Sequence, residues 1–142
     1  MEFIYSDGGR SKYFKAKDVG DCVVRAICNA SGKDYKEVYD ALRDLSKRQR
    51  VARHRKSPRN GVCKQVYRKY IEGILGWEWV SCSGIGKGIS VHLNEDEMPF
   101  EGTYIVRVSH RLTCVRDGAL VDTYDCSRFG ERGVYGYWVK RK

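Results

Sequence analysis

Apolar residues recur at intervals of three and four positions through the first half of the chain, a spacing that predicts helices with one buried face. The first helix follows Asp21, a residue suited to an N-cap, and ends at the turn Ser31-Gly32. A second helix begins with the D-x-x-E pattern of Asp34 and Glu37, which resembles a capping box. The two apolar faces consist of Val23, Ala26, Ile27 and Ala30, and of Tyr35, Val38, Tyr39, Leu42 and Leu45.

The helical spacing resumes after residues 58–61 and predicts a third helix that continues to Gly76. From Trp77 onward the pattern becomes an alternation of apolar and polar residues, which is typical of strands. We expect a hairpin over residues 110–125, because Asp117-Gly118 is a strong signal for a tight turn. The other predicted strands are WEWVSC (77–82), TYIVRVS (103–109) and GVYGYWVK (133–140).

Helices first and strands afterwards predict an α+β fold in which N-terminal helices pack on a C-terminal antiparallel sheet. The 142 residues are enough for one domain with its own core, and no repeat, linker or change of composition marks a second. We therefore expect a single domain over residues 1–142. A content of 42% hydrophobic and 32% charged residues excludes the disordered class.

The N-terminal segment MEFIYSDGGR has no basic stretch followed by an apolar one, and no apolar run has the length of a membrane span. These features predict a cytoplasmic monomer with no membrane partner. The six cysteines include no C-x-x-C pair, which argues against structural zinc. We expect reduced thiols, no metal and no cofactor.

Most of the positive charge lies in one segment. The formal net charge is +9, but residues 47–59, KRQRVARHRKSPR, hold seven Lys or Arg and no acid, so the rest of the chain has only 20 basic residues against 18 acidic ones. We interpret the segment as an insertion or an exposed helix end that recruits an acidic protein or nucleic acid. Its candidate binding residues are Arg50, Arg53, Arg55 and Lys56. The alternative is a solvated helix end without a partner.

Cys22 begins the first predicted helix, directly after Asp21. A thiol in the first turn lies at the positive end of the helix dipole and beside unpaired backbone N–H groups, and both favour the nucleophilic thiolate. The same N–H groups can bind the oxyanion that forms when a thiolate attacks a carbonyl. The pattern indicates a candidate nucleophile, and the alternative is a buried packing residue.

A catalytic thiol needs a base and a group that orients the base. His110 begins the hairpin, and a two-residue turn at Asp117-Gly118 pairs residues whose numbers sum to 235. His110 then faces Asp125, while Asp122 faces Thr113, so Asp125 is the predicted orienting group. A one-residue bulge would exchange it for Asp122. The alternative is an ordinary polar hairpin edge.

Three motifs together resemble the papain-like cysteine peptidase fold: GDC (20–22), SHRLTCVRDG (109–118) and DTYDCS (122–127). The interval between His110 and Asp125 is similar to that of small members, including Josephin-type deubiquitinases. The segments GDCVVRAI, YIVRVSH, VDTYD and YGYW look more closely like a family of small uncharacterised proteins of tailed bacteriophages. The papain-like resemblance implies Cys22 as nucleophile, His110 as base and then acid, and Asp125 as orienting group. Papain-like enzymes usually carry a glutamine shortly before the cysteine, and KAKDVGD (15–21) has none.

These observations predict a cysteine hydrolase that cleaves an amide, isopeptide or thioester bond, with acyl transfer to an amine equally compatible. A second hypothesis is a non-catalytic binding module on the same scaffold, which engages nucleic acid or an acidic host protein through residues 47–59. A third is a degenerate enzyme that keeps its triad only as structure.

Overall fold

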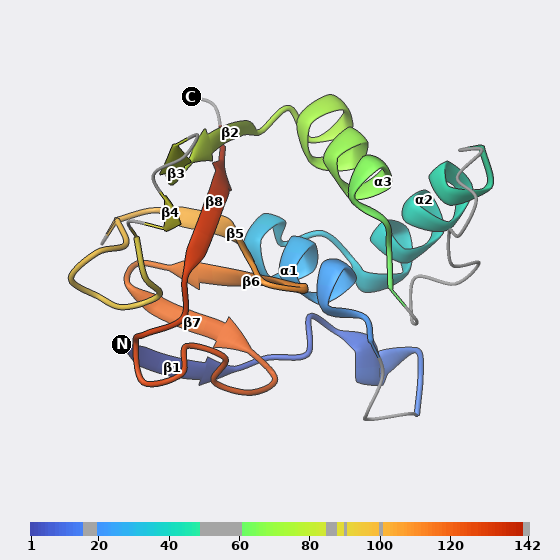
Figure 1. Cartoon of the computed structure of the whole chain (residues 1–142). Helices are drawn as coiled ribbons and strands as arrows, with labels where there is room; N and C mark the ends of the chain where they lie inside the picture. Colours follow the sequence, from blue (N-terminus) through green and yellow to red (C-terminus); the bar gives the residue numbers. More distant parts are fainter. Residues whose placement is uncertain (16–19, 49–60, 85–87, 90, 100, 141–142) are drawn as a thin grey trace.

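The computed structural model describes residues 1–15, 20–48, 61–84, 88–89, 91–99 and 101–140 (Figure 1). It has an α+β fold, as the sequence predicts. The helices are α1 (Cys22–Ser31), α2 (Tyr35–Arg48) and α3 (Lys64–Arg68), which continues as a π-helical segment, η3 (Lys69–Ile74); a short 3-10 turn, η1 (Arg10–Lys12), precedes them. None of the described helices combines the length and the apolar character needed to cross a membrane.

Six strands form the main sheet in the order β1-β7-β6-β5-β8-β2. They are β1 (Glu2–Tyr5), β2 (Glu78–Ser81), β5 (Thr103–Val108), β6 (Arg111–Arg116), β7 (Ala119–Asp122) and β8 (Val134–Val139), while β3 (Ser83–Gly84) and β4 (Gly88–Ile89) pair separately. The predicted antiparallel sheet is wrong at one edge, where β1 runs parallel to β7. That N-terminal strand was not predicted, because its side chains are exposed and show no buried alternation.

The hairpin of β6 and β7 confirms the predicted register. Cys114 lies opposite Val121 and Arg116 opposite Ala119, as a two-residue turn at Asp117-Gly118 requires. Both turn residues have positive φ, 48° for Asp117 and 79° for Gly118, a conformation for which Asp-Gly is suited. The strand β7 ends at Asp122, so the pairing does not continue to Asp125.

The helices cover one face of the sheet, with α1 against β5, β6 and β7, and α2 against α1 and α3 (Figure 1). A large apolar core joins the helices to Ile105, Leu112 and Trp138 of the sheet. A smaller core on the opposite face gathers Val106, Val108, Val115, Leu120 and Val134 with Leu93 and Met98. Because both faces are covered, β7 is buried along its whole length and β6 along most of it, and α1 packs against both strands.

A bulge changes the pairing of β5 with β8. Arg107 lies opposite Gly136, but Val108 lies opposite Val134, so β8 contains one extra residue, Tyr135. A bulge re-aims a side chain, and Tyr135 here lines a cavity on the same side as Trp138. Gly136 leaves room for Trp79, whose ring would come within 2.4 Å of a Cβ at that position.

Candidate active site

Cys22 is the first residue of α1 and is half-buried. It lines a cavity of about 600 Å³ between the start of α1, the start of α3 and the hairpin of β5 and β6. His110 lines the same cavity, together with Lys64 and Tyr67 of α3. The structure therefore brings together the predicted nucleophile and the predicted base from distant parts of the sequence.

His110 lies in the tight turn between β5 and β6, because Val108 pairs with Arg111 and leaves only Ser109 and His110 between the strands. Its φ of 58° is unusual for a residue other than glycine. The side chain is exposed and lines the cavity. Among the described residues nothing forms a hydrogen bond with the imidazole, so its position follows from the turn alone.

Asp125 does not face His110, and the predicted cross-strand pair is wrong. The residue lies in the loop after β7, is exposed, and accepts a hydrogen bond from the Ser127 backbone N–H at 2.9 Å. The register itself is as predicted, but β7 ends before it can bring Asp125 opposite His110. The chain turns at this point because residues 125–127 close an Asx-type turn in place of another ladder bond.

Asp122 lies beside Thr113 as predicted, but its carboxylate binds arginines and does not orient a histidine. It accepts hydrogen bonds from Thr113 Oγ1 at 2.7 Å, Arg111 Nη2 at 2.9 Å and Arg25 Nη2 at 3.4 Å. The residue is only 2% exposed, so this charge requires such partners. Asp122 therefore holds two arginines in place beside the cavity and does not contact His110.

Asp21 occupies the N-cap position of α1, yet its side chain makes no capping hydrogen bond. Its fully buried carboxylate instead binds Arg25, Arg10 Nη1 at 3.1 Å and the Tyr35 hydroxyl at 2.6 Å. The expectation that this carboxylate points at the helix N–H groups is wrong, because buried arginines compete for it more strongly than backbone amides do. The first-turn N–H groups beside Cys22 are consequently not used by Asp21.

The two aspartates and three arginines form one buried charge network behind Cys22. Arg25 links Asp21 to Asp122, and Arg111 and Arg10 complete the two ends. Arg25 and Arg111 also line the cavity. Because these two guanidinium groups line the cavity and the two carboxylates do not, its wall favours an anion.

The other cysteines have different surroundings, although none of the six forms a disulfide in this structure. Burial raises the pKa of both Cys28 and Cys114 to about 12, so they remain protonated at neutral pH. Burial also raises the pKa of Cys82 and Cys126. Cys63 lines the cavity with Cys22 and is likewise half-buried, which makes it the natural comparison for reactivity.

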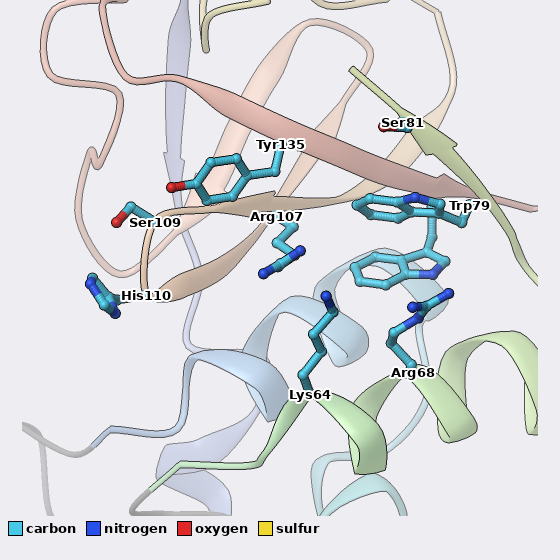
Figure 2. A pocket seen from close by; sticks show the side chains of 9 residues that line it. Lys64, Arg68, Trp79, Ser81, Arg107, Ser109, His110 and Tyr135 are labelled. Atoms are coloured by element: carbon cyan, nitrogen blue, oxygen red, sulfur yellow. The ribbon is translucent and has the colours of Figure 1, made fainter. Parts of the chain in front are cut away.

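A second cavity of about 460 Å³ adjoins the first and shares Lys64, Arg107 and His110 with it. Figure 2 shows Lys64 of α3 and Arg107 of β5 directed toward one another across the gap between helix and sheet. Neither residue belongs to the site that the sequence predicts. A signal existed for Arg107, because alternation along β5 places it on the face of Ile105, which belongs to the core beneath the helices.

The predicted binding residues Arg50, Arg53, Arg55 and Lys56 lie outside the described part of the chain, as does most of the basic segment 47–59; its first two residues end α2. Within the described ranges, no three side chains of His, Cys, Asp or Glu come together as metal ligands.

Comparisons with known proteins supply no further identification. No family model matches the chain, and neither a curated protein nor a solved structure is significantly similar to it.

Proposed function

We propose that this protein is a cysteine hydrolase or acyltransferase in which Cys22 is the nucleophile and His110 is the base. The observation that carries the proposal is the shared cavity of about 600 Å³, which a thiol at a helix start and an imidazole on a strand turn both line. The papain-like resemblance is also supported by the placement of Cys22 at the start of α1 and of His110 in the turn between two strands of the sheet. A bacteriophage origin remains part of the same proposal.

In the proposed reaction His110 takes the Cys22 proton, and the thiolate sulfur attacks the carbonyl carbon of an amide, isopeptide or thioester. The resulting oxyanion is stabilised by backbone N–H groups of the first turn of α1, which the helix itself leaves unpaired. The imidazolium then protonates the leaving group as the carbonyl re-forms. Water, or an amine in the transferase case, releases the acyl group and regenerates the thiol.

The proposal rests on two residues rather than three. Asp125 is bonded to the Ser127 N–H and Asp122 to Arg25 and Arg111, so we assign neither as the orienting group of His110. Arg25 and Arg111, which line the same cavity, supply positive charge for the oxyanion instead. In this assignment the arginines take the role of the glutamine that papain-like enzymes usually carry before the cysteine and that residues 15–21 lack.

Acylation by p-nitrophenyl acetate tests the proposal. We expect one acetyl group on Cys22 by peptide mass spectrometry, formed much faster than acetylation of Cys63, and lost on hydrolysis. Cys22→Ser and His110→Gln should each abolish this reaction, whereas Cys63→Ser, on the same cavity wall, should leave its rate unchanged. Acetylation of Cys63 at an equal rate, or an unaffected His110→Gln variant, would contradict the proposal.

A second candidate function is a non-catalytic binding module, favoured by the basic and aromatic lining of the second cavity, where Lys64, Arg68 and Arg107 accompany Trp79 and Tyr135. Lysine and arginine contacts to phosphates release counterions, so binding of nucleic acid falls steeply with salt. A single-stranded oligonucleotide that binds the wild type and Cys22→Ala equally, with a steep salt dependence, would favour this function over the hydrolase.

A further inference from the structure

Lys64 and Arg107 form a pair of cations without a carboxylate. Both line the two adjoining cavities, and no ion pair among the described residues includes either of them. The Arg107 guanidinium lies over the Tyr135 ring, 5.3 Å from its centroid, and it also opposes the burial that raises the pKa of Tyr67. The two side chains converge from opposite walls, with His110 at one end of the same groove (Figure 2).

The walls around this pair are aromatic. Trp79 and Tyr135 line the cavity, and the buried Trp138 closes its base. The bulge in β8 positions the Tyr135 ring, and the absence of a side chain at Gly136 leaves room for the Trp79 ring. A ligand that fits here has one anionic group for the cations and an apolar portion for the rings.

The positive charge does not continue along the groove. Arg68, the next cation, is already paired with Glu72 at 2.7 Å, and Glu72 also accepts a hydrogen bond from Trp138 at 3.2 Å. Of the cations that line this cavity, Arg68 is therefore already neutralised and contributes little to binding the successive phosphates of a nucleic acid. A single carboxylate with a short hydrocarbon stem matches the groove better.

We propose that the groove binds an acidic side chain of a peptide substrate, with its carboxylate between Lys64 and Arg107. The inference rests on the proposed function, since it takes the groove to be the continuation of the site at Cys22 and His110. The proposed substrate is an acidic peptide, and Lys64 and Arg107, rather than the basic segment 47–59, recognise its acidic side chain. Charge-assisted hydrogen bonds from two cations supply the preference for glutamate over glutamine.

The test uses two fluorescein-labelled peptides, Ala-Ala-Glu-Ala-Gly and Ala-Ala-Gln-Ala-Gly, in fluorescence polarisation with the full chain carrying Cys22→Ser, so that binding is measured without reaction. We expect the Glu peptide to bind about tenfold more tightly. Lys64→Met and Arg107→Met should each remove this preference while leaving the affinity for the Gln peptide unchanged. Lys69→Met is the matched control, because Lys69 is exposed beside the same helix but lines neither cavity.

The outcomes separate the two proposals. A Glu preference that depends on Lys64 and Arg107 in a protein whose Cys22 does not acylate would sustain the anion site and refute the hydrolase. Equal binding of the two peptides, no binding of either, or a preference that survives both substitutions would overturn the anion site. Displacement of the Glu peptide by a single-stranded oligonucleotide that binds more tightly would overturn it as well.

Discussion

Asp122 at the end of β7 accepts a hydrogen bond from Arg111 at the start of β6, 2.9 Å from Nη2 to Oδ1, and both residues are largely buried. The same carboxylate contacts Arg25 of α1. This relationship ties the cysteine-bearing helix to the hairpin that carries His110. Asp122 is therefore a structural partner of two arginines.

Asp122→Asn should destabilise the fold by about 3–5 kcal/mol, because it removes the carboxylate that pairs with Arg111 and leaves Arg25 with Asp21 alone. Urea unfolding followed by circular dichroism measures the change. Asp125→Asn is the matched control, since its carboxylate is exposed and accepts one backbone hydrogen bond, and it should cost no more than about 1 kcal/mol. A small loss for Asp122→Asn would refute the charge network as a stabilising element.

Asp125→Ala should leave the alkylation rate of Cys22 and its dependence on pH unchanged. The physical reason is that Asp125 bonds to Ser127 and not to the imidazole. The rate is measured with iodoacetamide between pH 5 and 9. A loss comparable to that caused by His110→Ala would restore Asp125 as the third catalytic residue, and with it the pairing that the sequence predicts.

The sequence predicts the helices, the hairpin register and the position of Cys22 at a helix start, because these depend on local periodicity and on one turn motif. It does not predict that β7 ends at Asp122, since strand length depends on tertiary contacts. Nor does it predict which groups the Asp21 carboxylate binds, because an aspartate that caps a helix and one in a buried ion pair look alike in sequence. Arg107 was missed as a groove residue because a charge within an apolar strand gives no indication of its partners.

Gly136→Ala should destabilise the protein by about 1–3 kcal/mol, because an added Cβ would meet the Trp79 ring at 2.4 Å and the Val80 carbonyl oxygen at 2.6 Å. Gly73→Ala is the matched control: it lies in the π-helical segment η3 with nothing within 4 Å, so it should be neutral or stabilising by up to about 1 kcal/mol. Thermal unfolding compares the two. Equal effects would mean that Trp79 does not pack on Gly136.

The free energy of unfolding should fall as the pH rises above about 9. Burial raises the pKa of Cys28 from 9.0 to about 12, so the folded state keeps a proton that the unfolded chain releases. The stabilisation is complete below pH 9 and is lost as the pH rises toward 12; Cys114 behaves in the same way. Urea titrations at pH 8, 9 and 10 measure the slope. The slope should be shallower in Cys28→Ala, and an unchanged slope in this variant would contradict the assignment.

The pairing of Cys22 with His110 is tested most directly by the pH dependence of iodoacetamide alkylation, read at each cysteine by mass spectrometry in the wild type and in His110→Ala. We predict that Cys22 reacts well below pH 7, ahead of Cys63 in the same cavity, and that it loses this advantage without His110. If Cys22 titrates like a free thiol with a pKa of about 8.5, or reacts identically in both proteins, the two residues are not a catalytic pair and the hydrolase account is wrong.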